Sequence, residues 1–240
     1  MKLSSKAKGI YAKINQETTK LGDLRKIAKE IKRDHELAME LWSTNKFMPR
    51  ELAILIMDKK LLSQKVIDQL DMDIQNHEFE ERNQLIDWLM ANQLSKDKKT
   101  IALMESWENS PSVLQRRVFW YYQARLRWMG NTNHSNTEDL LSSIEANMAN
   151  EQAEVQWAMN YTAGQIGKWQ EEYRARCILI GEETGLYKDE VVPKNCTPIF
   201  TCHLEAKFSI ITECCVVVNA KTFVIFEPHV QRIDKYVYSQ

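Results

Sequence analysis

Apolar residues recur every three or four positions along most of this chain, the spacing that places them on one face of a helix. Asp34 lies between two such runs and predicts a helix start there, because its carboxylate can accept hydrogen bonds from the free N–H groups of a first turn. Only 7 Gly and 5 Pro interrupt the 240 residues. The pattern therefore predicts an all-α protein, beginning with helices between Leu24 and Trp42.

Capping residues predict further helix starts along the chain. Pro49 suits the first turn of one helix, because it lacks the N–H that would be unsatisfied there. Ser63 suits the N-cap of another helix, which we expect to run through Leu70. The same spacing predicts helices over residues 80–94, 97–107, 111–128, 138–148, 152–166 and 171–185.

About ten helices joined mostly by short turns predict antiparallel helix pairs. The pairs would start near Leu24, Pro49, Glu80, Pro111 and Gln152, at or below the HEAT-type period of about 40 residues. We therefore expect residues 1–202 to form an α-solenoid, a superhelix of antiparallel HEAT-like pairs with a concave face. Such faces bind extended partners.

Residues 203–240 depart from this pattern. The segment 208–226 is rich in Val, Ile, Thr, Phe and Cys, and residues 214–218 and 222–226 predict short strands around a turn. A short β-like hairpin and an atypical tail both fit this composition. We treat 203–240 as a region separate from the helical domain.

Charge is unevenly distributed on a chain whose net charge is −1. Ten Lys or Arg and three acidic residues precede residue 34, whereas residues 68–87 hold seven acidic residues and one Arg. Such asymmetry can create a basic face on a nearly neutral molecule. We expect Arg25 and Lys29 in the basic segment to track a nucleic-acid backbone, and a solvated helix face is the alternative.

The cysteines and the apolar runs bear on compartment and cofactors. The five cysteines lie in the last third without zinc-site spacing, which favours reduced thiols in a cytoplasmic protein. The lysine-rich N-terminus does not resemble a signal peptide, and no run of about 18 apolar residues predicts a membrane span. We expect a cytoplasmic monomer that uses no cofactor and no metal.

Several segments carry a resemblance to a known family. They are LRKIAK at 24–29, HELAMELW at 35–42, AMNYTAGQIG at 158–167, IGE at 180–182, GLY at 185–187 and VPKNCT at 192–197. In this order and spacing they resemble the DNA alkylation repair family of the AlkD type, over about residues 20–200. The resemblance does not extend beyond His203.

The resemblance implies a stack of HEAT-like repeats that grips double-stranded DNA on its concave face. Active members excise N3- and N7-alkylated purines, whose positive charge weakens the glycosidic bond, without flipping the damaged base into a pocket. Their site uses two aromatic side chains and a carboxylate that can stabilise the cationic sugar and position a water. An arginine nearby contacts the DNA backbone.

The family pattern can be carried over position by position. Its carboxylate falls on Asp87, and the Trp expected one helical turn earlier is replaced by Asn83. The second aromatic falls on Tyr161, where Trp is usual. The backbone-contacting arginine falls on Arg116, and the adjacent Arg117 is a further phosphate candidate.

Gly164 replaces an arginine that the family places three residues after the second aromatic. Contacts to an aromatic face are worth about 1–3 kcal/mol, so losing one predicts roughly 10- to 100-fold weaker catalysis. Asp87 on a solvated helix face, and Tyr161 in the core, are the alternatives to functional roles.

Three functions therefore fit the sequence. The first is a DNA glycosylase, a hydrolase that excises N3- or N7-alkylated purines with Asp87 stabilising the cationic sugar. The second is a catalytically impaired DNA-binding module for damaged or branched DNA, favoured by Asn83 and Tyr161. The third is a HEAT-like scaffold for protein interactions, favoured by the near-neutral charge and the acidic segment 68–87.

Overall fold

The computed structural model describes residues 3–16, 18–130 and 134–187. These residues form eleven α-helices and several short 3₁₀ turns, with no strand among them. The prediction of an all-α fold is therefore confirmed. The predicted strands, the tail at 203–240 and the segment 192–197 lie outside the described residues.

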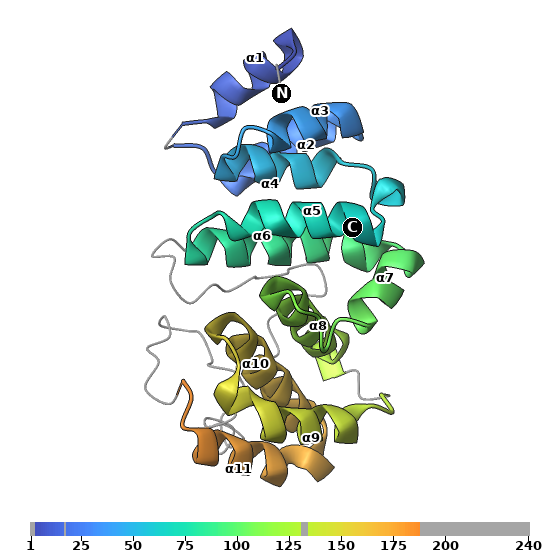
Figure 1. The fold of residues 1–240 in the computed structure, drawn as a ribbon, viewed down its shortest axis with the longest axis vertical. Coiled ribbons are helices and arrows are strands. Elements are labelled where there is room, and N and C mark those ends of the chain that lie inside the picture. Colours follow the sequence, from blue (N-terminus) through green and yellow to red (C-terminus); the bar gives the residue numbers. More distant parts are fainter. Residues whose placement is uncertain (1–2, 17, 131–133, 188–240) are drawn as a thin grey trace. The chain divides into compact units, whose positions relative to one another are not determined.

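The helices follow one another closely along the chain (Figure 1). They are α1 Ser5–Ile14, α2 Leu21–Ile31, α3 His35–Trp42, α4 Phe47–Ile56, α5 Gln64–Gln75, α6 Phe79–Asn92, α7 Lys98–Glu105, α8 Val113–Leu126, α9 Thr137–Asn147, α10 Ala153–Trp169 and α11 Arg174–Thr184.

Two predicted helix caps are confirmed by hydrogen bonds. The Asp34 carboxylate accepts from the Leu37 N–H at 3.1 Å, and the Ser63 hydroxyl oxygen accepts from the Val66 N–H at 3.4 Å. The helix that Ser63 caps continues to Gln75, five residues beyond the predicted end. Each cap satisfies a backbone donor that has no partner within its own helix.

Helix α1 is absent from the sequence-based prediction. Ala7, Ile10, Tyr11 and Ile14 do follow helical spacing, but only Ala7 and Ile14 of its ten residues are buried. The structure holds it by contacts that are distant in sequence, because α1 packs on α3 and α4. Tertiary contacts therefore stabilise a short helix that buries few of its own residues.

The chain divides into two compact units, and the division falls within α8 after Gln115. In the first unit, helices that alternate along the chain lie side by side: α2 packs on α4, and α4 packs on α6. Helices α3 and α5 pack on α4 and α6, respectively (Figure 1). Helix α4 is therefore surrounded, and even Arg50 and Glu51 on it are buried.

In the second unit α10 packs between α9 and α11. The Thr162 hydroxyl on α10 donates to the Trp120 carbonyl at 2.7 Å and ties α10 to α8. Arg127 is fully buried and donates to Gln123, Asn136 and Thr137. Burial lowers its pKa to about 10. These polar contacts fix the end of α8 against the start of α9.

Gly130 follows α8 at a point where no other residue fits. Its φ of +78° lies in the left-handed region, and a Cβ there would sit 3.2 Å from the Trp169 ring at the end of α10. Both the backbone angle and the close approach require glycine. The close approach to Trp169 fixes the end of α8 relative to α10.

The predicted starts of the helix pairs fall on the even-numbered helices. Leu24, Pro49, Glu80 and Gln152 lie on or next to the first turns of α2, α4, α6 and α10, and Pro111 precedes α8. Helix α1 precedes this series. In the first unit α2 packs on α4 and α4 packs on α6, so these three helices form one layer.

Candidate functional site

All seven residues proposed from the sequence lie on even-numbered helices. In the first unit they are Arg25 and Lys29 on α2 and Asn83 and Asp87 on α6. In the second unit they are Arg116 and Arg117 on α8 and Tyr161 on α10. The two groups belong to different units, and each is described within its own unit.

Asp87 lies in the most buried part of α6. Every residue from Leu85 to Ala91 is buried, because α6 packs on both α4 and α5. Asp87 is 6% exposed, so the alternative that it sits on a solvated helix face is wrong. A carboxylate in this position is largely desolvated, which strengthens its interaction with a nearby cation.

Arg25 lies beside the residue that follows Asp87. Its guanidinium carbon is 4.9 Å from the centre of the Trp88 ring. The Trp88 indole N–H in turn donates to the Glu51 carbonyl at 3.2 Å. Side chains of α2 and α6 and a backbone carbonyl of α4 therefore meet at Trp88, the residue after Asp87, where an arginine held over an indole provides a fixed positive charge.

Lys29 and Asn83 differ in how they are held. Lys29 is exposed one turn after Arg25 on α2. Asn83 is half-buried one turn before Asp87, and its Oδ1 is buried without a donor among the described residues. A buried acceptor left without a partner costs about 1–3 kcal/mol. The aromatic face that the family pattern expects is replaced here by an unsatisfied amide.

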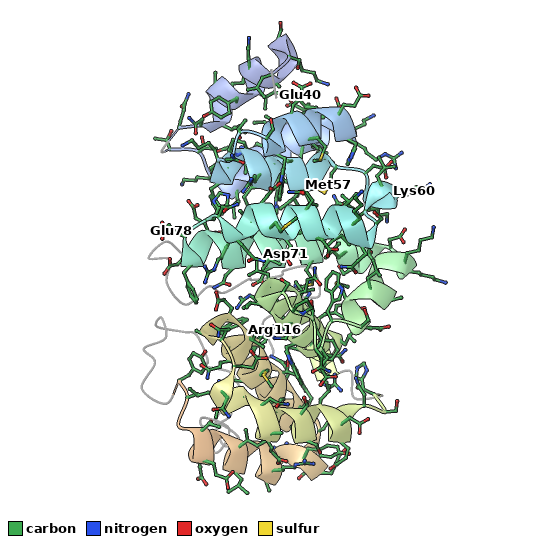
Figure 2. The ribbon with its side chains drawn as sticks, in the orientation of Figure 1. Glu40, Met57, Lys60, Asp71, Glu78 and Arg116 are labelled. Atoms are coloured by element: carbon green, nitrogen blue, oxygen red, sulfur yellow. The ribbon has the colours of Figure 1, made fainter. Side chains whose placement is uncertain are left out.

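Arg116 forms a two-point ion pair with Glu151, the residue two positions before α10 (Figure 2). Its Nε donates to Oε1 at 2.9 Å and its Nη2 donates to Oε2 at 3.0 Å. The side chains are 17% and 20% exposed. This fork geometry matches a carboxylate and a phosphate equally well.

Arg117 is buried, with 6% of its surface exposed. Its Nη1 donates to the Glu154 carbonyl at 3.0 Å, and its guanidinium lies over the Trp157 ring at 4.6 Å. These contacts join α8 to the first turns of α10. The structure therefore gives no support to the phosphate contact predicted for Arg117.

Tyr161 belongs to a cluster of aromatic side chains. Its ring stacks on Trp157 with centroids 5.2 Å apart and planes 7° apart, and it meets Tyr121 edge-on at 5.8 Å. Its hydroxyl accepts from the Trp128 indole N–H at 3.0 Å. Burial raises the pKa of Tyr161 above its ordinary value, so the phenol stays neutral. The phenol is desolvated, although the residue as a whole keeps a small exposed surface.

Trp157 is a candidate that the sequence analysis missed. It stands one helical turn before Tyr161, so the i, i+4 spacing of two aromatics on α10 was an available signal. The indole Nε1 is buried without an acceptor among the described residues. Arg125 on α8 completes the cluster, with its guanidinium 5.3 Å from the Trp128 ring and 5.9 Å from Tyr121.

The described residues also bear on metals and membranes. No three His, Cys, Asp or Glu gather among them as ligands for a metal ion. None of the helices in these ranges combines the length and the apolar character needed to span a membrane. Burial raises the pKa of the Cys177 thiol to about 12, which keeps it protonated and unreactive.

Comparison with known proteins identifies the class. The family model described as the DNA alkylation repair enzyme matches residues 16–176. The chain therefore belongs to the DNA alkylation repair enzyme family. No curated protein matches it.

A solved structure supports the fold. It is described as "a new family of proteins related to the HEAT-like repeat DNA glycosylases with affinity for branched DNA structures". Its sequence is 22% identical, the match covers 75% of this chain and 77% of that chain, and the TM-score is 0.56. The fold of this chain is therefore of the HEAT-like repeat type.

Proposed function

We propose that this protein binds double-stranded DNA, alkylated or branched, through its even-numbered helices. The observation that carries the proposal is the placement of cationic and aromatic side chains on this one series of helices. Helix α2 bears Arg25 and Lys29, and α8 bears the partly exposed Arg116 and no acidic residue. Helix α10 adds Tyr161, which is partly exposed. Cations neutralise phosphates and aromatic faces stack on bases or sugars.

The side chains around Asp87 favour binding over excision as the main activity. Asn83 offers no ring face to a sugar or base, and Asp87 is almost completely buried. A weaker hold on the sugar reduces stabilisation of the transition state, which is where catalysis acts. The affinity for branched DNA described for the similar solved structure supports branched DNA as one substrate to test.

Excision of N3- or N7-alkylated purines is the second candidate, favoured by the retained carboxylate of Asp87. In this reaction the bond between C1′ and the base nitrogen breaks, and the cationic base leaves with the bonding electrons as a neutral purine. The Asp87 carboxylate would stabilise the cationic sugar until a water oxygen bonds to C1′. The water proton would pass to solvent.

Base release from methylated duplex DNA tests excision. We expect slow release of 7-methylguanine or 3-methyladenine by the wild-type protein and none by Asp87→Asn, while Glu105→Gln, at an exposed site on α7, releases base at the wild-type rate. Thermal unfolding of all three proteins checks that they are folded. Equal release by Asp87→Asn and the wild type would remove Asp87 from the chemistry.

Binding is tested separately with labelled duplex and four-way junction DNA at about 50 mM salt, where phosphate contacts are strong. We expect salt-sensitive binding to both. Absence of binding under these conditions would overturn the proposed function. It would favour the protein-interaction scaffold, for which the acidic segment 68–87 is the specific observation.

A further inference from the structure

Helix α1 lies outside the segment that defines the family. The family match begins at residue 16, and α1 ends at Ile14. The helix carries Lys6, Lys8 and Lys13 and no acidic residue.

Contacts within the first unit fix α1 in place. Ala7 and Ile14 are buried against the neighbouring helices. The Ser4 N–H donates to the Glu40 carboxylate at 2.6 Å, and the Lys6 ammonium pairs with Asp34 at 2.6 Å (Figure 2). Because α1 is anchored by these contacts, the positions of Lys8 and Lys13 on its surface are defined.

Residues 1–33 hold ten basic and three acidic residues, a net charge of +7, so the remaining chain carries −1 − 7 = −8. Part of the positive charge is neutralised by the pairs Lys6–Asp34, Lys26–Asp23 and Arg33–Asp58. Four exposed lysines of α1, α2 and the following residue form no ion pair with the described residues: Lys8, Lys13, Lys29 and Lys32.

A paired cation must leave or share its carboxylate before it binds an anion. Unpaired and exposed lysines release counterions when they meet phosphates, and this release supplies the affinity of sequence-independent DNA binding. A single lysine of this kind is ordinary surface. Four of them within residues 8–32, in a chain whose remaining residues are acidic on balance, favour a local positive potential.

We propose that Lys8, Lys13, Lys29 and Lys32 form a surface, the α1–α2 lysine surface, that binds the phosphate backbone of duplex DNA. This inference rests on the proposed function and extends the DNA contact beyond the family-matched residues to α1. Lys29 lies one turn from Arg25 on α2. The Arg25 guanidinium lies over Trp88, the residue that follows Asp87 in the sequence, so Lys29 connects the surface to the candidate site.

The dependence of duplex affinity on salt concentration tests this surface. The variant Lys8→Gln/Lys13→Gln removes two charges that pair with no described residue, and it keeps good helix formers at both positions. The matched control is Lys98→Gln/Lys99→Gln on α7, which removes two exposed lysines of the same unit. Binding to a labelled duplex is measured by fluorescence anisotropy between about 50 and 200 mM salt.

We expect the slope of log affinity against log salt to become shallower by about 1.8 in the α1 variant, about 0.9 for each phosphate that a lysine no longer neutralises. The control variant should keep the wild-type slope, and all proteins should unfold at the same temperature. A wild-type slope in the α1 variant would overturn the surface while leaving the proposed function intact. Absence of duplex binding by the wild type would overturn both.

A membrane surface is the other large anion that such lysines could meet. The same proteins are therefore mixed with vesicles that contain phosphatidylserine. Vesicle binding that disappears in the α1 variant, combined with an unchanged DNA slope, would reassign the surface to anionic lipid and overturn the inference.

Discussion

The guanidinium of Arg116 and the carboxylate of Glu151 meet at two points, with Nε to Oε1 at 2.9 Å and Nη2 to Oε2 at 3.0 Å. The arginine proposed to hold a DNA phosphate is therefore already paired with a carboxylate in the free protein. A phosphate must either displace Glu151 or share the guanidinium with it. The pair is partly exposed, so displacement does not require unfolding of the surrounding helices.

Replacing Glu151 should strengthen DNA binding. Glu151→Gln removes the competing charge from Arg116 and one negative charge from the surface, so we expect duplex affinity to rise by about 3- to 10-fold, or about 0.7–1.4 kcal/mol. Arg116→Ala should lower the affinity for every duplex sequence and reduce the salt slope by about 0.9. Anisotropy titrations measure both. If neither variant changes the affinity, Arg116 only joins α8 to the residues before α10.

Tyr161 should act through its ring rather than its hydroxyl. Tyr161→Phe keeps the stack on Trp157 but removes the acceptor for the Trp128 N–H, so we expect a loss of about 1 kcal/mol in unfolding free energy and no loss of DNA affinity. Tyr161→Ala should weaken DNA binding by about 1–3 kcal/mol.

Denaturant unfolding and duplex titration separate these two effects. The double variant Tyr161→Phe/Trp128→Phe should be little less stable than Trp128→Phe alone, because the Trp128 substitution already removes the hydrogen bond. A loss of affinity in Tyr161→Phe as large as that in Tyr161→Ala would show that the hydroxyl itself contacts DNA.

Asp71 on α5 should make the protein less stable as the pH rises (Figure 2). Burial raises the pKa of this carboxyl, and the nearby Asp68 adds to the effect, while hydrogen bonds from Gln75 and Ser112 oppose it. The folded protein therefore binds the Asp71 proton more tightly than the unfolded chain. Its contribution to stability is largest below the ordinary aspartate pKa of about 3.9 and is lost as the pH rises through the folded pKa.

Asp71→Asn removes this dependence and keeps groups that can bond Gln75 and Ser112. We expect the variant to be more stable than the wild type at neutral pH, with the difference shrinking as the pH falls towards about 4. Urea denaturation at several pH values measures it. A difference that stays constant with pH would mean that Asp71 titrates alike in the folded and unfolded chains.

Asp34 provides a control of opposite sign. The Lys6 ammonium and the Leu37 N–H hold the pKa of its carboxyl below the ordinary value. Its stabilising contribution is present above about pH 4 and is lost as the pH falls through the lowered pKa. Asp34→Asn should therefore be less stable than the wild type at neutral pH, although asparagine still caps α3.

The fold was predictable because helix signals are local. Asp34 and Ser63 mark helix starts through hydrogen bonds to residues three positions away, so the sequence alone predicts them. Helix α1 was missed because its stability depends on contacts such as Ser4 with Glu40, which are 36 residues apart. The spacing of Ala7, Ile10, Tyr11 and Ile14 indicates a helix, but it does not indicate those contacts.

The candidate site was predictable only in part, because side-chain partners depend on distant helices. The pattern placed Arg116 and Arg117 side by side as cations, but Glu151 pairs with the first and the packing against Trp157 buries the second. Two adjacent residues on a helix point in different directions, so equal residue types do not imply equal roles. The family resemblance supplied Asp87 and Tyr161, whereas Trp157, marked in the sequence only by its i, i+4 spacing from Tyr161, is identified by the stacking geometry.

Replacing Asn83 should raise the free energy of unfolding and lower the affinity for DNA. The buried Oδ1 of Asn83 has no donor among the described residues, so Asn83→Ala removes an unsatisfied acceptor and improves helix propensity. We expect the free energy of unfolding of the variant to be about 1 kcal/mol higher than that of the wild type. Asn92→Ala on the same helix is the control. The Asn92 amide donates to the Trp88 carbonyl at 2.9 Å, so its removal should not stabilise the protein.

If the Asn83 Oδ1 accepts a hydrogen bond from DNA, the more stable Asn83→Ala protein should bind duplex more weakly. Destabilisation by Asn83→Ala in denaturant titrations would instead indicate that a water satisfies Oδ1 in solution, and the substitution of the family's Trp would then be a structural adjustment within α6.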